Sequence, residues 1–219
     1  MGTITRTFAN NITTSGVFKP TAFNNASFDN VTAVPGGAVE GGDMVLLSTQ
    51  TASASTSISF TTGIDSTYKE YMFVFNNLHP ATDNTDFQFN MSTDSGSNYN
   101  VTKTTTFFRP YHNEADTGTD LAYRTSDDLA QSTSFQVLSS IVGNDADKNT
   151  SGTLTLFNPS STTFVKHFIA NNNAITSNDY SMQFFVAGYG NTTSAVDAVR
   201  FQMSSGNIDA GTIQMFGIL

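Results

Sequence analysis

The chain lacks cysteine and carries little charge. None of its 219 residues is Cys, and Asp, Glu, Lys and Arg make up 12% of them, where an ordinary soluble domain has about 25%. The absence of thiols excludes disulfides and thiolate metal sites. Packing and backbone hydrogen bonds must therefore stabilise the fold.

Basic residues are especially scarce. Eighteen acids against nine bases give a net charge of -9, and Lys and Arg form no dense run. Duplex nucleic acid and anionic membrane surfaces both require a basic face, so neither partner is expected. We find no apolar segment typical of a secretory signal and none long enough to span a bilayer. We therefore expect a soluble protein without membrane insertion.

Thr, Ser, Asn and nineteen Phe take the place of charge. From residue 44 onward, short runs of β-branched and aromatic residues alternate with polar ones, and helical periodicity is nearly absent. Phe87, Phe89 and Met91, for example, face one way while Gln88 and Asn90 face the other. Two facing sheets would bury such stripes, which predicts an all-β, antiparallel sandwich of jelly-roll type.

The expected strands are separated by Gly, Asn, Asp and Ser. They are 44–48, 57–60, 71–78, 87–92, 99–109, 132–138, 152–157, 164–171, 182–189, 199–203 and 212–218. The longest polar interruption, 110–131, is predicted to be a surface loop with one helical turn near 127–130.

The first 43 residues differ in composition from the body at 44–219, because they are rich in Asn, Thr and Gly and end in two Gly pairs. This predicts an N-terminal arm with a hinge. Phe18, Phe23 and Phe28 recur every five residues, a spacing that resembles the pentapeptide repeat of right-handed β-solenoids. Two or three units are fewer than a solenoid needs. We therefore favour an extended arm whose three Phe are assembly anchors, with a short solenoid as the alternative.

Patterns that carry catalysis are missing from the sequence. His79, His112 and His167 lie in different segments without metal-ligand spacing. No nucleophile elbow, thiol or phosphate-binding Gly loop occurs. The chain is therefore expected not to be an enzyme.

Paired carboxylates leave one enzymatic alternative, a glycan depolymerase, since glycosidases use two acids. Glu114 and Asp116 are the leading pair. Two further pairs are close in sequence: Asp83 with Asp86, and Asp127 with Asp128. All of them fall in predicted turns, where an exposed acid is the default, so this alternative is the least favoured.

One acidic segment resembles a calcium loop. Asp145, Asp147 and Asn149 offer oxygen ligands at alternate positions. Thr150 and Leu156 stand where an EF-hand has Gly and Glu, which favours a polar hairpin turn. No cofactor is expected, with calcium as the alternative.

Another turn resembles the Asp-box of sialidase-type propellers. Ser92, Asp94 and Gly96 match that motif, while Asn98 and Tyr99 depart from it. The box is a structural turn in that family. We predict a hairpin connector in which Asp94 caps the turn and Gly96 supplies a positive φ.

Aromatic residues at 107–111 are the candidate ligand face. Phe107 and Phe108 are adjacent in a predicted strand and point to opposite sides, so one of them, with Tyr111, could stack on a sugar. The alternative is that both Phe are buried.

Several segments together resemble structural proteins of tailed, particularly marine, bacteriophages, of the tail-fibre, appendage or capsid-decorating type. They are 63–71 with Phe73 and Phe75, 80–83, 92–96, 206–208 and 211–218. The resemblance implies a non-enzymatic virion component with a β-sandwich body and brings no catalytic residues. We expect localisation in the virion, contact with other virion proteins, and a homotrimer or another symmetric oligomer. A host-glycan adhesin is the alternative.

Overall fold

The structure is a computed structural model that describes residues 44–218, and this part of the chain consists of strands and connections without a helix. The prediction of an all-β sandwich is confirmed. The predicted arm, with Phe18, Phe23 and Phe28, lies outside the described residues.

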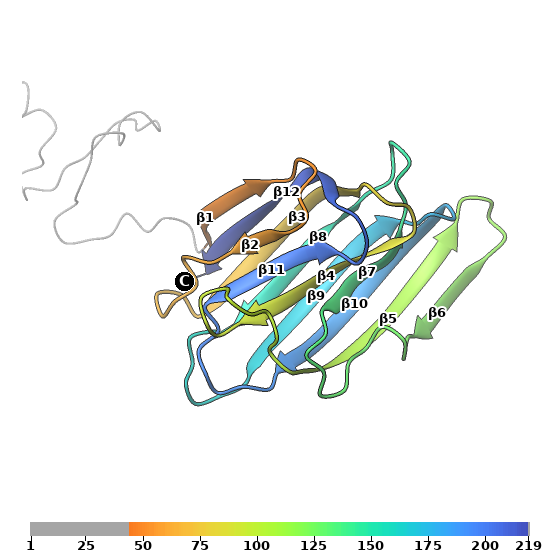
Figure 1. Cartoon of the computed structure of the whole chain (residues 1–219). Helices are drawn as coiled ribbons and strands as arrows, with labels where there is room; N and C mark the ends of the chain where they lie inside the picture. The colour runs from red at the N-terminus through yellow and green to blue at the C-terminus, as the bar shows by residue number, and fades with distance from the viewer. Residues whose placement is uncertain (1–43, 219) are drawn as a thin grey trace, which may run out of the picture. The chain divides into compact units, whose positions relative to one another are not determined.

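Twelve strands follow one another along the described chain (Figure 1). They are β1 (Met44–Thr51), β2 (Ile58–Phe60), β3 (Glu70–Pro80), β4 (Thr85–Ser92), β5 (Lys103–Asn113), β6 (Thr119–Tyr123), β7 (Gln136–Val142), β8 (Thr150–Phe157), β9 (Lys166–Ile175), β10 (Tyr180–Gly190), β11 (Ala198–Met203) and β12 (Ile208–Ile218).

The strands form two antiparallel sheets of unequal width. The larger sheet has eight strands in the order β1-β12-β3-β8-β9-β10-β5-β6, and the smaller has four in the order β2-β11-β4-β7. When β5, β6, β9 and β10 are set aside, the remaining eight strands divide four to each sheet. Consecutive strands cross between the sheets except at β4–β7, which pair within the smaller one. This is the strand order of a jelly roll.

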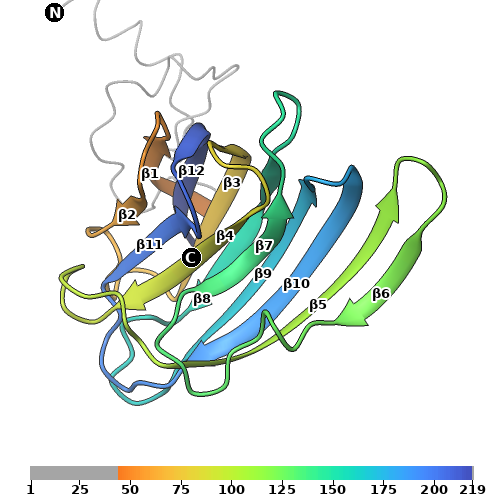
Figure 2. The same cartoon turned by 45° about the vertical axis from the view of Figure 1, so that its right-hand side comes forward.

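The four other strands widen the larger sheet. β9 and β10 continue antiparallel from β8, and the β5–β6 hairpin pairs with the far side of β10. Figure 2 shows this extension reaching beyond the smaller sheet. Its inner face is covered partly by β7, where the Asn172 side-chain amide donates to the Leu138 carbonyl at 3.2 Å. The Gln136 side chain also accepts a bond from the Thr105 hydroxyl at 2.6 Å.

Phenylalanines fill the space between the two sheets. Alternate residues of β3, β4 and β11 point inward, and their rings meet around Phe201 of β11. The Phe201 ring centroid lies 5.2 Å from that of Phe73 and 5.1 Å from that of Phe75, both on the opposite sheet. Phe87 stacks on the same ring at 5.9 Å. The inward stripe predicted for β4 is confirmed, since Phe87 is among its fully buried residues.

The interruption at 110–131 was expected to be a loop, and this prediction is wrong for much of its length. β5 continues to Asn113, and β6 pairs with it in register, with Pro110 opposite Leu121. The sequence did not reveal β6 because it is a strand of five residues at the sheet edge, where the side chains are mostly exposed and no buried apolar stripe is required. Near Asp127 there is a turn closed on the Arg124 carbonyl and no helix.

The Asp94 turn has the predicted cap but a different connectivity. The Asp94 carboxylate accepts bonds from the Ser92 hydroxyl at 2.7 Å and the Asn98 amide at 2.8 Å. Hydrogen bonds from Asn98 and Ser92 lower the pKa of the Asp94 carboxyl to about 2. Gly96 has a φ of +82°, as predicted. The turn is not a hairpin, because it leads from β4 to β5 in the other sheet.

Gly96→Ala is expected to lower the free energy of unfolding by about 1–3 kcal/mol, because an L side chain is strained at positive φ. A Cβ atom would also lie 2.7 Å from the Tyr99 hydroxyl and 2.8 Å from Thr61 Cγ2. Urea unfolding followed by circular dichroism measures the change. Gly118→Ala is the matched control, since a Cβ there meets only ordinary contacts at 3.7 Å or more. Equal losses in both variants would contradict this explanation.

Candidate functional site

The outer face of the larger sheet carries rows of uncharged side chains. The strand registers align one residue from each strand in a row that crosses the whole sheet. This row, called here the Phe185 row, is Thr49, Gln214, Val74, Thr153, Asn171, Phe185, Phe108 and Tyr123. The adjacent Ala187 row is Leu46, Phe216, Met72, Thr155, Ile169, Ala187 and Thr106. Neither row contains a charged residue.

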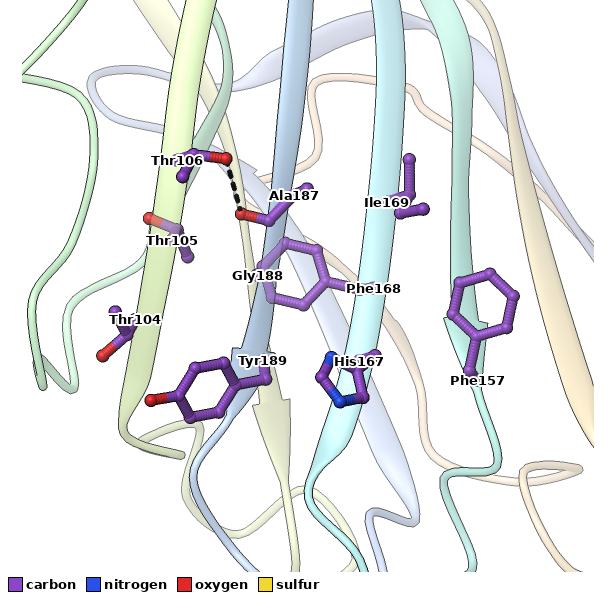
Figure 3. A pocket seen from close by; sticks show the side chains of 10 residues that line it. All are labelled: Thr104, Thr105, Thr106, Phe157, His167, Phe168, Ile169, Ala187, Gly188 and Tyr189. Carbon is purple, nitrogen blue, oxygen red and sulfur yellow. Dashed lines mark hydrogen bonds between the residues drawn. The ribbon is translucent and has the colours of Figure 1, made fainter.

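A hollow of about 470 Å³ opens on this face over β8, β9, β10 and β5. Figure 3 shows Tyr189, His167 and Phe157 side by side along one side of it. Along the other side lie Ile169 and Ala187, with Thr106, whose hydroxyl donates to the Ala187 carbonyl at 3.4 Å. The hollow exists because Ala187 is a small residue between larger neighbours.

A second hollow of about 230 Å³ adjoins the first and shares Thr106, Ile169 and Ala187 with it. It extends to Phe108 and Phe185, whose rings stack with centroids 4.8 Å apart and an interplanar angle of 9°. The two hollows together are called the outer groove. Aromatic rings stand at both ends of the groove, and Ala187 lies in its middle.

The lining of the outer groove determines what it can contact. It consists of aromatic, aliphatic, Thr and Asn side chains with one imidazole, that of His167, and no carboxylate, ammonium or guanidinium group. Tyr189 and His167 lie with ring centroids 6.0 Å apart. Such a surface offers apolar ring contacts and hydroxyl or amide hydrogen bonds.

The predicted ligand face is only partly at the surface. Phe108 lies on the outer face, with 39% of its surface exposed, and lines the outer groove. Phe107 is fully buried, so Phe108 is the member of this adjacent pair that reaches the surface. Tyr111 lies on the inner side of β5, where its ring packs against Tyr180 at 5.0 Å. The three residues are close in sequence, but alternation along β5 directs Phe107 and Tyr111 to the inner face and Phe108 to the outer face.

The calcium candidate forms an ion pair in this structure. The Lys148 ammonium lies 2.7 Å from the Asp145 carboxylate and 2.8 Å from that of Asp179. Hydrogen bonds to these two aspartates raise the pKa of Lys148. Asp147 and Asn149 belong to the same connection, which joins the two sheets and is not a hairpin. Within residues 44–218 no three acidic or His side chains gather as a metal would require, and calcium binding stays an untested alternative.

The proposed carboxylate pairs lie at the surface or have structural partners. Glu114 and Asp116 are exposed in the β5–β6 turn, where the Asp116 carboxylate contacts His112 Nε2 at 3.0 Å. Asp128 accepts a bond from the Tyr123 hydroxyl at 2.6 Å. Burial raises the pKa of Asp86, whose carboxylate accepts the Ile141 amide at 2.9 Å.

The remaining candidates, His79, Asp83 and Asp127, each contact a group in a loop or turn. His79 Nε2 lies 3.2 Å from the Asp145 carbonyl oxygen. Asp83 accepts the Asn144 amide at 3.2 Å, and Asp127 lies 3.7 Å from Arg124 Nε. These contacts stabilise the connections between strands.

Comparisons with known proteins give no family. No protein-family model matches the chain, and no curated protein matches it either. Among the described residues, no helix has the length and apolar character needed to cross a membrane. The site is therefore interpreted from its own geometry.

Most residues of the outer groove were not found from the sequence. Ile169, Ala187 and Tyr189 come from strands that were expected, but alternation gives each strand two faces without saying which strands are neighbours. One sequence pattern could have indicated the groove. On the outward faces of β9 and β10, large side chains stand among polar ones: His167, Ile169, Phe185 and Tyr189.

Proposed function

We propose that this chain is a non-enzymatic structural protein of a bacteriophage particle, in which residues 1–43 dock on the particle and the jelly roll projects. The outer face of the eight-stranded sheet is the observation that supports this proposal. The Ala187 and Phe185 rows cross the sheet without a charge. Extended apolar and uncharged surface is typical of faces that pack against other molecules.

The body adds further support. Jelly rolls serve in viral capsids and in lectins, although a fold by itself does not establish a function. A body stabilised by packing, without disulfides, suits repeated docking on a symmetric particle, with copies of itself and other virion proteins as partners. A homotrimer or another symmetric oligomer is part of this proposal.

Recognition of a host glycan is a second candidate function. It is favoured by the outer groove, whose Phe108 and Tyr189 rings lie at opposite ends of an uncharged hollow. A projecting virion protein can carry such a site, so the two candidates are compatible.

Deleting residues 2–34 is expected to leave the jelly roll folded and to abolish incorporation into particles. Thermal unfolding of the purified variant and mass spectrometry of purified particles measure the two effects. Replacing Phe18, Phe23 and Phe28 together by Ala should reproduce the loss of incorporation. The matched control replaces Thr13, Thr14 and Thr21 by Ala. An unfolded deletion product would contradict the division into arm and body, and normal incorporation would contradict the docking role.

A further inference from the structure

We infer that the outer groove is a binding site for neutral glycan chains. The inference rests on the second candidate function above and names its class of ligand. It uses the surface of residues 44–218 and holds whether or not the chain is a virion protein. It differs from the ligand face expected from the sequence, because it is built from four strands and uses Phe108 but neither Phe107 nor Tyr111.

The groove has the length of a short oligosaccharide. Tyr189 and Phe185 are four residues apart on β10, which places their side chains about 13 Å from each other along the strand. Ala187 lies between them and leaves the hollow open. A sugar chain lying along β10 would contact Tyr189 and His167 at one end and the stacked Phe108 and Phe185 rings at the other.

The polar groups beside these rings match sugar hydroxyls. Along β5 the Thr104 hydroxyl oxygen accepts two bonds from Gln131 and keeps its proton to donate, while the Thr106 hydroxyl donates to the Ala187 carbonyl and keeps its capacity to accept. The Asn171 side chain extends from β9. The Asn171 amide oxygen accepts a bond from Gln183 Nε2 at 2.9 Å, which orients the Asn171 amide group. Hydroxyls and amides both donate and accept hydrogen bonds, as the hydroxyls of a sugar do.

The absence of charged side chains in the groove lining favours neutral over anionic glycans. An anionic glycan is recognised by Arg or Lys in charge-assisted bonds, and neither residue type lines the groove. The chain as a whole has a net charge of -9, which repels anions further. Within the groove itself a protein partner is less well matched, because Thr and Asn residues interrupt the apolar surface between the rings. The proposed contacts with other virion proteins would use the rest of the outer face.

The test uses the purified full chain on an array of neutral and acidic oligosaccharides, followed by calorimetric titration of those that bind. We expect binding of neutral glucan, mannan or xylan oligosaccharides and none of sulfated or uronic-acid chains. Ala187→Leu, which fills the hollow, and Tyr189→Ala, which removes a ring, should each weaken binding about tenfold or more. Tyr189→Phe should retain most of the affinity.

Leu46→Ala is the control, since Leu46 is 52% exposed at the opposite edge of the same sheet and should not affect binding. Circular dichroism establishes that each variant is folded; if Tyr189→Ala unfolds, Ala187→Leu and Phe108→Ala decide. Failure of the wild-type chain to bind any neutral glycan would overturn the inference, and so would preference for acidic chains. Unchanged glycan binding in Ala187→Leu would also overturn it. So would a groove occupied by a second copy of the chain, observed as self-association that Ala187→Leu abolishes.

Discussion

Phe201→Ala is expected to lower the free energy of unfolding by about 3–5 kcal/mol, the range for removing a fully buried aromatic ring. Phe201 of the smaller sheet contacts rings of both sheets. Its centroid is within 5.2 Å of Phe73 and Phe75 in the larger sheet and 5.9 Å from Phe87 in its own. The substitution would leave a cavity between the sheets that these neighbours fill only in part. Urea unfolding monitored by circular dichroism gives the loss directly.

The matched control for Phe201→Ala is Phe164→Ala. Phe164 is 68% exposed in the connection before β9, so its removal should change the free energy of unfolding by no more than about 0.5 kcal/mol. If Phe201→Ala were as mild as this control, the rings around Phe201 would not constitute the centre of the core.

The second large effect concerns a buried lysine, Lys103 of β5. Its ammonium group is fully buried and bonded to the Asn90 side-chain oxygen at 2.6 Å and the Val101 carbonyl at 2.8 Å. Burial lowers the pKa of Lys103 from 10.5 to about 7. Lys166, also buried, has a lowered pKa for the same reason.

Stability should therefore rise between pH 7 and pH 10. In this window the unfolded chain holds the Lys103 proton while the folded chain has released it, so raising the pH favours folding. Below about pH 7 both states are protonated and the cost of burying the charge is fully present. Each tenfold change in proton affinity corresponds to about 1.4 kcal/mol, so the Lys103 contribution across the window is on the order of 4 kcal/mol.

Denaturant unfolding at several pH values between 7 and 10 measures this slope. Lys103→Met should flatten it, leaving the contribution of Lys166, whose lowered pKa acts in the same direction. Lys69→Met is the control, because Lys69 is exposed and its replacement should leave the slope as in the wild type. A slope that is the same with and without Lys103 would contradict the burial of a charge at this position.

The position of the outer groove relates the fold to the proposed functions. Three of its four strands, β9, β10 and β5, are additions to the eight strands of the jelly roll. These strands extend the larger sheet beyond the smaller one and create outer surface that the jelly-roll strands alone would not have. Glycan binding would thus be carried by the extension, and assembly by the arm and the rest of the body.

Much of the fold was predictable because local patterns decide it. The alternation of Phe87, Phe89 and Met91 with polar residues identified an inward stripe, and all three side chains are fully buried. The same rule failed at β6, an edge strand whose apolar side chains, Leu121 and Tyr123, are exposed, so that it has no buried stripe. Turn residues likewise suggested hairpins after β4 and β7, where the chain in fact crosses to the other sheet.

The sequence by itself determined the class of fold, the capped turn at Asp94 and Gly96, and the scarcity of charge on the strands. Only the tertiary structure decided which strands are neighbours. Phe185 and Phe108 stack although they are far apart in the chain, because β10 pairs with β5. A period of two residues tells which side chains share a face of one strand, but long-range pairing and register determine which strands bring those faces together. The outer groove depends on this long-range pairing, because its lining comes from four different strands.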